Sequence, residues 1–231
     1  MTPLITPLAR EQMAWRVAQD IPHNAPGGTY VNLGIGMPEL VANHLPDDAD
    51  IMFHCENGIL GMGPVARRGE EDFDLITAGK KPVTVVPGAA FFDSTDSFAM
   101  IRGGHIDIAV LGAFQISRTG DLANWSTGDN TVIPAVGGAM DLAQGAKRVF
   151  VITNHQSRDG APKIVETCTY PLTGRGVVST VFTDLAVIDV TPAGLMVREI
   201  VDGLGLADLQ AKTGAPLTAA PDCRTLARPQ N

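Results

Sequence analysis

The chain has 231 residues, of which 45% are hydrophobic, and a formal net charge of −8 at pH 7. This length and composition suit one α/β domain with a sizeable core. The negative charge argues against nucleic acid and anionic membranes as main partners. Because Cys55, Cys168 and Cys223 form no Cys-x-x-Cys pair, we expect a reducing, cytoplasmic location without a disulfide framework or a metal site.

Both ends of the chain show little hydrophobic periodicity. Residues 1–8 hold two prolines, and residues 218–231 are rich in Ala, Pro and polar side chains. We therefore expect two loose termini around one domain at residues 9–217. The N-terminus does not have the pattern of a signal peptide, and no apolar run reaches the roughly 18 residues of a membrane span.

An amphipathic helix is predicted over residues 9–21, since Met13, Val17 and Ile21 recur every four residues. Pro22 and the glycines that follow are expected to end this helix.

A strand from Thr29 then leads into a first glycine loop, Asn32-Leu-Gly34-Ile-Gly36, and Pro38 suits the first turn of a helix over residues 39–45. Such a strand–loop–helix unit can hold phosphates or carboxylates on backbone N–H groups. The spacing fits a tight connection without a ligand equally well, because neither a third glycine nor a Walker lysine follows.

Residues 50–64 contain the strongest candidate for chemistry. The apolar run Ile51–Phe53 predicts a short buried strand that leads to Glu56-Asn57-Gly58, with Gly61 and Gly63 after it. Open α/β sheets bind ligands at the C-terminal ends of their strands. A carboxylate fixed there could be a nucleophile, a general base or a cation ligand. The alternative is a glutamate that caps a turn, because Asn-Gly is a common turn signal.

Charged stretches follow this strand. The acidic run at residues 69–74 predicts a solvated loop, and Lys80-Lys81 would by themselves be two surface charges. Val83–Val86 predicts a strand that ends at Pro87-Gly88.

Other polar residues leave two interpretations open. His105 could be a base, but the absence of an evident Ser or Cys partner favours a structural histidine. A thiol-protease function through Cys55 is disfavoured, because nothing local activates that thiol. Gln115 and Asn124 could orient a substrate or satisfy loop backbone groups.

A second glycine loop begins at Ile133 and passes through Gly137 and Gly138 into a short helix over residues 140–145. Successive N–H groups in such a loop can point at a developing oxyanion. From the spacing alone, a tight turn is the favoured alternative. Further strands are predicted over 149–153, 177–182, 185–190 and 195–200, with a short helix over 206–213.

Several of these motifs, in this order, resemble those of the β subunits of class I CoA-transferases. His54-Cys55-Glu56-Asn57-Gly58 is similar to the family's Ser-Glu-Asn-Gly signature, with Cys55 in place of serine. Further matches are Asn32–Gly36, Thr77–Lys80, Gly112–Ser117, Gly120–Trp125, Ile133–Leu142 and Cys168–Gly174. The resemblance extends over residues 9–217. The acidic loop and the motif around Gly137 favour the 3-oxoadipate subgroup over the acetoacetate subgroup.

The resemblance implies an α/β fold of the sugar-phosphate isomerase-like type, with one open, mostly parallel sheet and flanking helices. It implies that Glu56 attacks succinyl-CoA and carries CoA as a glutamyl thioester before CoA passes to 3-oxoadipate, with acetoacetate as the alternative acceptor. It also implies a partner α subunit, in an α2β2 assembly, and no permanently bound cofactor or metal.

The resemblance assigns roles to further residues. Gly137 and Gly138 would donate to the oxyanion or thioester carbonyl, and Asn32 and Lys80 would lie near CoA. The supporting loop residues would be Asn57, Gly58, Gly34 and Gly36. A function from a different class is also open, namely a sugar-phosphate isomerase relative or a ligand-sensing protein in which Glu56 acts as a proton-transfer base.

Overall fold

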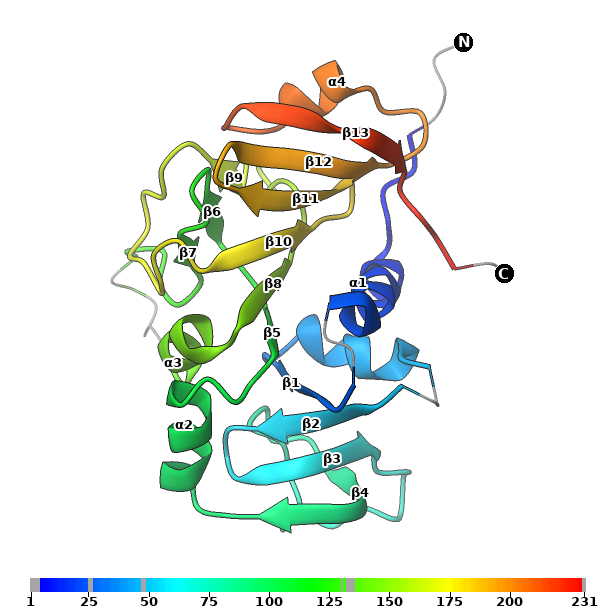
Figure 1. Ribbon diagram of the computed structural model, residues 1–231, viewed down its shortest axis with the longest axis vertical. Coiled ribbons are helices and arrows are strands. Elements are labelled where there is room, and N and C mark those ends of the chain that lie inside the picture. The colour runs from blue at the N-terminus through cyan, green and yellow to red at the C-terminus, as the bar shows by residue number, and fades with distance from the viewer. Residues whose placement is uncertain (1–4, 25–26, 47–48, 130, 132–135, 230–231) are drawn as a thin grey trace.

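The computed structural model describes residues 5–24, 27–46, 49–129, 131 and 136–229. Among them, ten strands form one long sheet, in the order β13-β12-β11-β10-β8-β5-β1-β2-β3-β4 (Figure 1). These strands are β1 (Thr29–Leu33), β2 (Ile51–Cys55), β3 (Ile59–Val65), β4 (Val83–Phe91), β5 (Ile108–Leu111), β8 (Arg148–Ile152), β10 (Val178–Phe182), β11 (Ala186–Thr191), β12 (Gly194–Ile200) and β13 (Leu217–Thr225).

A small sheet and short helices complete the described structure. The small sheet has the order β7-β6-β9, and its strands are β6 (Gln115–Ser117), β7 (Leu122–Ala123) and β9 (Ile164–Val165). The helices are α1 (Arg10–Asn24), the 3-10 helix η1 (Pro38–His44), α2 (Ser94–Arg102), α3 (Ala139–Gly145) and α4 (Leu206–Gln210). In Figure 1, α1 and η1 lie on one side of the central strands, and α2 and α3 lie on the other.

The centre of the large sheet is parallel. Adjacent strands β10, β8, β5, β1 and β2 all run in the same direction, and antiparallel hairpins extend the sheet on both sides. Every residue of β5 is buried, as expected for a parallel strand covered on both faces. The predicted α/β fold is therefore confirmed. Its parallel centre brings the ends of β1, β2, β5 and β8 to one edge, where the candidate site lies.

The helical periodicity at the start of the chain is also confirmed, because Met13, Val17 and Ile21 of α1 are buried in the core. The predicted end of this helix is wrong, since α1 continues through Pro22 to Asn24. The Asn24 side chain donates to the Asp20 carbonyl over this last turn, and the packing of Ile21 fixes the turn against the core.

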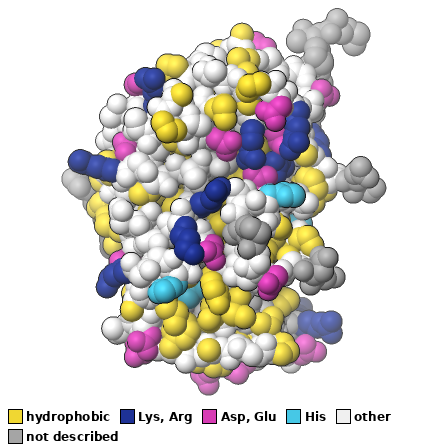
Figure 2. Space-filling model, in the orientation of Figure 1, with side chains coloured by type: hydrophobic (Ala, Val, Ile, Leu, Met, Phe, Trp, Pro, Cys, Tyr) yellow, Lys and Arg dark blue, Asp and Glu magenta, His cyan; other side chains and the backbone are white. Residues whose placement is uncertain are grey.

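Two strand predictions also need correction. β4 does not end at Pro87-Gly88 but continues to Phe91. It is an edge strand, where a proline can be accommodated because no neighbouring strand needs its missing N–H. Residues 51–53 of β2 are half-buried rather than buried, since they lie near the end of the sheet. Figure 2 shows hydrophobic side chains gathered over this β2–β4 end.

The termini are not loose where the structure describes them. Residues 217–225 form β13, which pairs in parallel with β12, and Leu226 donates its N–H to the Ile200 carbonyl. Leu8 is buried and donates its N–H to the Asp184 carbonyl. Residues 1–4, 230 and 231 lie outside the described residues. No helix in the described part of the chain is both long and apolar enough to cross a membrane.

A buried ionic cluster holds α1 against the end of the sheet. Arg16 makes two bonds of 2.8 Å to the fully buried carboxylate of Glu199 on β12, and its third contact is Asp20 at 2.6 Å. Arg224 of β13 also reaches Glu199, at 2.8 Å. Figure 2 shows charged side chains of both signs on this part of the surface. The cluster therefore joins the first helix to the last two strands.

Candidate active site

Glu56 lies in the tight turn between β2 and β3, at the C-terminal end of β2. The turn depends on Gly58, which has a φ of +113° and donates its N–H to the Cys55 carbonyl. A Cβ at this position would lie 2.0 Å from the Phe92 carbonyl oxygen. A glycine is thus required here, and the short turn fixes the half-buried Glu56 side chain at the edge of the sheet.

The Asn32 amide contacts the Glu56 carboxylate from the neighbouring strand. Asn32 pairs with His54 in the β1–β2 register, and its Nδ2 lies 3.2 Å from Glu56 Oε2. The same Nδ2 is 3.1 Å from the His54 carbonyl and 3.2 Å from His54 Nδ1. Asn32 is fully buried. This side chain therefore orients Glu56, while its predicted proximity to CoA stays a prediction.

Behind Asn32, the His54 ring continues the hydrogen-bond chain into the core. Its Nε2 lies 3.0 Å from Ser97 Oγ on α2, and Ser97 Oγ is 3.4 Å from the Cys55 carbonyl. Burial lowers the pKa of His54 to about 4, so the ring is neutral near pH 7. The network assigns the tautomer with the proton on Nε2, since Nδ1 then accepts from Asn32.

The second glycine loop faces Glu56 from the other side. A Cβ added to Gly138 would lie 3.6 Å from Glu56 Cγ and 3.1 Å from the Phe98 ring. The structure thus brings together Gly138 and Glu56, which are 82 positions apart in the sequence. No hydrogen bond from the N–H of Gly137 or Gly138 to another described residue is found. Residues 132–135 of this predicted loop lie outside the described residues.

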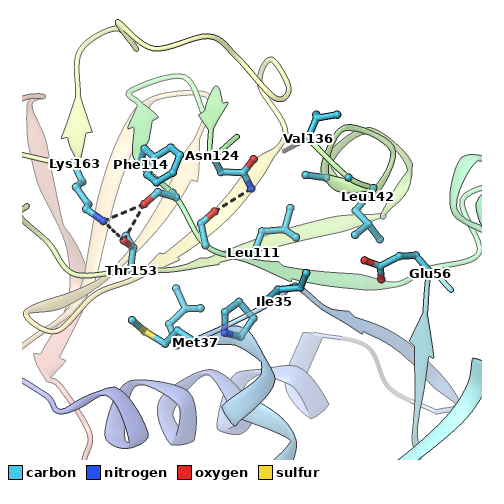
Figure 3. A pocket seen from close by; sticks show the side chains of 18 residues that line it. Ile35, Met37, Glu56, Leu111, Phe114, Asn124, Val136, Leu142, Thr153 and Lys163 are labelled. Carbon is cyan, nitrogen blue, oxygen red and sulfur yellow. Dashed lines mark hydrogen bonds between the residues drawn. The ribbon is translucent and has the colours of Figure 1, made fainter. Parts of the chain in front are cut away.

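A cavity of about 430 Å³ opens between the two glycine loops. Figure 3 shows Glu56 at one side of it and Lys163 at the opposite side. The lining residues are Gly34, Ile35, Met37, Pro38, Glu56, Leu111, Gly112, Ala113, Phe114, Asn124, Val136, Gly137, Gly138, Ala139, Leu142, Ile152, Thr153 and Lys163. Its wall is largely apolar, with Asn124, Thr153 and Lys163 grouped away from Glu56. Sequence reasoning assigned no role to Thr153 or Lys163.

The first glycine loop uses its N–H groups within the protein. Gly34 donates to the Val110 carbonyl at 2.8 Å, and Gly36 donates to Glu39 Oε2 at 3.1 Å. Glu39 also pairs with Lys81 at 2.6 Å. The tight-connection alternative thus describes these two N–H groups better than the anion-binding alternative does. The loop still lines the cavity, through Gly34, Ile35 and Met37.

The predicted CoA-binding Lys80 lies outside the cavity lining, on an exposed turn and with a φ of +61°. Its loop is attached to the Glu56 turn, because Asn57 Nδ2 donates to the Ile76 carbonyl at 2.6 Å and Ala78 N–H donates to Cys55 Sγ at 3.2 Å. Burial raises the pKa of the Cys55 thiol. Cys55 therefore acts as a buried hydrogen-bond acceptor and not as an activated nucleophile.

The remaining polar candidates differ in their hydrogen bonds and in whether they line the cavity. Gln115 Oε1 accepts the N–H groups of Thr169 and Tyr170, so this side chain satisfies loop backbone. Asn124 does the same by donating to the Gly112 carbonyl, but it also lines the cavity. His105 is exposed and does not line the cavity. Among the described residues, no group of three or more His, Cys, Asp or Glu could hold a metal ion.

Comparison with known proteins identifies the family. The sequence of residues 10–208 matches the protein-family model described as Coenzyme A transferase. The chain belongs to the coenzyme A transferase family. One subunit of the 3-oxoadipate CoA-transferase of Acinetobacter baylyi is 57% identical, over 92% of this chain and 96% of that protein. One subunit of the succinyl-CoA:3-ketoacid coenzyme A transferase of Helicobacter pylori (strain 26695) is 48% identical, over 89% of this chain and 97% of that protein.

Solved structures agree with the fold of this coenzyme A transferase family member. The apoenzyme of the acyl-CoA transferase YdiF from Escherichia coli O157:H7 has a TM-score of 0.71 at 18% identity, over 97% of this chain and 45% of that chain. Glutaconate coenzyme A-transferase from Acidaminococcus fermentans has a TM-score of 0.69 at 18% identity, over 98% of this chain and 92% of that chain. At this identity the likeness concerns the fold. The expectation of a CoA-transferase is confirmed by the family match.

Proposed function

We propose that the chain is the β subunit of a CoA-transferase that moves CoA from succinyl-CoA to 3-oxoadipate, with Glu56 as the covalent nucleophile. The observation that carries this proposal is the position of Glu56 at the cavity edge, where Asn32 contacts its carboxylate and Gly138 faces its side chain. The relative from Acinetobacter is named as a 3-oxoadipate CoA-transferase subunit, which supports 3-oxoadipate as the acceptor.

In the first half of the reaction, a Glu56 oxygen attacks the thioester carbonyl of succinyl-CoA. The new C–O bond replaces the C–S bond, which gives a mixed anhydride and releases CoA thiolate. The thiolate then attacks the Glu56 carbonyl of the anhydride. A glutamyl-CoA thioester forms on Glu56, and succinate leaves with the bridging oxygen, which is the Glu56 oxygen that attacked.

In the second half, the carboxylate of 3-oxoadipate attacks the Glu56 thioester and CoA thiolate leaves again. The thiolate attacks the acyl carbonyl, which forms 3-oxoadipyl-CoA and restores the Glu56 carboxylate. A carboxylate is needed because an acyl group that can itself carry CoA retains the free energy of the thioester. An enzyme-bound ester on serine would not retain it.

Each tetrahedral intermediate develops an oxyanion, which N–H donors stabilise. The N–H groups of Gly137 and Gly138 are the candidates, since Gly138 lies beside Glu56. Losing one such donor typically costs about 10²–10³-fold in rate. Asn32 holds the attacking carboxylate, and Lys80 stays our candidate for contact with CoA. CoA acts here as a substrate and covalent intermediate, without a permanently bound cofactor.

We further propose an α subunit as the partner, in an α2β2 assembly in the cytoplasm. Two apolar side chains at the cavity remain exposed, namely Ile35 at 65% and Phe114 at 40%, and so does Met140 on α3, at 39%. Burial of such side chains is favourable. The two relatives are each named as one subunit of a transferase, which supports a partner subunit.

Intact-mass spectrometry of this chain, purified with its α partner and mixed with succinyl-CoA, tests the mechanism. We expect a mass increase of one CoA less one water, located on the peptide that contains Glu56. Glu56→Gln should abolish the adduct, because an amide cannot form the anhydride. Glu70→Gln on the exposed acidic loop is the matched control and should keep it.

Absence of the adduct with a competent partner would refute this mechanism and favour an isomerase-like or ligand-sensing function. If the adduct forms, the rates of its discharge by 3-oxoadipate and acetoacetate decide the acceptor. Acetoacetate is included in this experiment because the chain is 48% identical to the Helicobacter succinyl-CoA:3-ketoacid transferase subunit.

A further inference from the structure

Lys163 contributes a cation to the cavity of Glu56. It precedes β9, is half-buried, and lines the cavity together with Thr153 and Asn124. Its Nζ donates to the Ala113 carbonyl at 3.1 Å and to Thr153 Oγ1 at 2.9 Å (Figure 3). An ammonium group has three N–H donors. The third donor of Lys163 is therefore uncommitted toward the described residues.

The charge of Lys163 has no close counter-ion among the described residues. In that part of the chain, no carboxylate lies within 4.0 Å of its Nζ. Asp184 acts on it at longer range, and its Oδ1 accepts the His155 N–H at 2.7 Å. Burial lowers the pKa of Lys163. A half-buried cation that faces neutral oxygens carries a desolvation cost that an anionic ligand would offset.

The rest of the cavity determines the shape of that ligand. Apolar side chains such as Leu111 and Leu142 line the cavity between the polar group at Lys163 and the carboxylate of Glu56. A fitting ligand would have an apolar middle, an anionic group at one end and the reacting acyl carbon at the other.

We propose that Lys163 binds the distal carboxylate of a dicarboxylic acyl group whose other end reacts at Glu56. This inference rests on the proposed function and specifies its substrate class. A 3-oxo dicarboxylate can pair with Lys163 while its C1 carboxylate attacks the Glu56 thioester. A monocarboxylate of equal length places a methyl group there and leaves the cation unpaired. Lys163 is thus a specificity residue that makes the enzyme prefer diacids over monoacids.

Discharge of the preformed thioester tests this inference. The enzyme–CoA thioester is prepared with the α partner and succinyl-CoA, freed of succinate, and mixed with 3-oxoadipate or with 3-oxohexanoate. These acids differ in their C6 group, which is a carboxylate in one and a methyl in the other. In Lys163→Met, the preference for the diacid should fall by roughly 10–100-fold, since a charge-assisted hydrogen bond is lost. The rate with the monoacid should change little.

Matched variants separate recognition from structure. Lys163→Arg keeps the charge and should retain part of the preference. Lys147→Met removes an exposed lysine that pairs with Asp107 outside the cavity, and should leave the ratio unchanged. If Lys163→Met unfolds, Lys163→Gln replaces it. An equal loss of rate for both acids, or an unchanged ratio, would overturn the inference. Absence of any thioester in the wild-type enzyme would refute the proposed function itself.

Discussion

A single primary amide, that of Asn32, connects the catalytic candidate to the core. Its Nδ2 lies within 3.2 Å of Glu56 Oε2 and of both a backbone and a ring acceptor of His54. Its Oδ1 has no hydrogen-bond partner among the described residues. Among the described residues, one donor group therefore orients the Glu56 carboxylate, and a buried neutral histidine holds this donor group.

Substitution of Asn32 should slow the loading of CoA onto Glu56 without unfolding the protein. Asn32→Ala removes the donor, and we expect a loss of about 10–100-fold, since a hydrogen bond to a charged group is lost. Asn32→Asp should be worse, because two carboxylates would then lie side by side. Rapid-quench measurement of thioester formation gives the rates. Equal rates for wild type and both variants would show that Asn32 does not position Glu56.

Gly138 has little room for a side chain, because Phe98 and Glu56 lie next to it. In Gly138→Ala, the new methyl group meets the Phe98 ring at 3.1 Å and approaches Glu56 Cγ. We expect the rate of thioester formation to fall by at least about tenfold, as small displacements of reacting groups are costly. Phe98→Leu in the same chain should restore part of the rate by making room. No rescue would mean that contact with Phe98 is not the cause.

The sequence predicted the strand and the turn that position Glu56, because strand, turn and glycine signals are local there. It could not predict that Ser97 bonds to His54, since 43 positions separate the two. Lys163 was missed for a similar reason. One lysine beside a short apolar run gives no local signal, and its place in the cavity depends on how β5, β8 and β9 are arranged.

At the scale of elements, the Arg16–Glu199 cluster fixes α1 to β12 and β13. Glu199→Gln removes the charge on which Arg16 and Arg224 converge. Breaking a buried ion pair leaves an uncompensated charge, so we expect the free energy of unfolding to fall by about 3–5 kcal/mol. Urea denaturation followed by circular dichroism measures the change.

The chain offers a control for this prediction in the exposed Arg118–Glu166 pair, whose charged atoms are 3.3 Å apart. Glu166→Gln should cost less than about 1 kcal/mol, because exposed pairs contribute little. A similarly small effect for Glu199→Gln would show that the cluster does not stabilise the attachment of α1.

Elements with a clear pattern were predicted, and those whose stability comes from distant contacts were not. α1 and β8 follow from their hydrophobic patterns. β13 was mistaken for a loose tail because alanines, a proline and polar residues dilute its pattern. Its pairing with β12 and the bond from Arg224 to Glu199 supply the stabilisation that the local sequence lacks.

For the whole molecule, two buried histidines should make stability depend on pH. Burial lowers the pKa values of His54 and His155 to about 4, from 6.5. In the unfolded chain these histidines bind protons as the pH falls below 6.5, whereas in the folded protein they do not until about pH 4. The free energy of unfolding should thus decrease between pH 6.5 and 4, by roughly 3 kcal/mol for each histidine.

Urea denaturation at pH 7 and pH 5 measures the part of this decrease that occurs above pH 5. His54→Gln should reduce the pH dependence, because one buried titrating group is gone. His105→Gln removes an exposed ring and should leave the dependence as it is in the wild-type protein. A free energy of unfolding that is flat over this pH range in the wild type would contradict the prediction.

The global fold was predictable because several motifs with matching order and spacing span the chain, and the family match confirms the family that they indicate. The relation between distant motifs was not predictable from spacing. Gly138 and Glu56 lie side by side because β2, α2 and α3 meet at one edge of the sheet, which is a property of the packed structure.

The missing side chain of Gly58 has a consequence for genetic variation. Glycine is the sole amino acid without a Cβ, so every missense change at codon 58 introduces an atom at the 2.0 Å approach to the Phe92 carbonyl. No conservative substitution exists there, whereas most positions of a protein tolerate several. In a saturation mutagenesis library selected for growth that needs this enzyme, codon 58 should retain synonymous variants and lose all others.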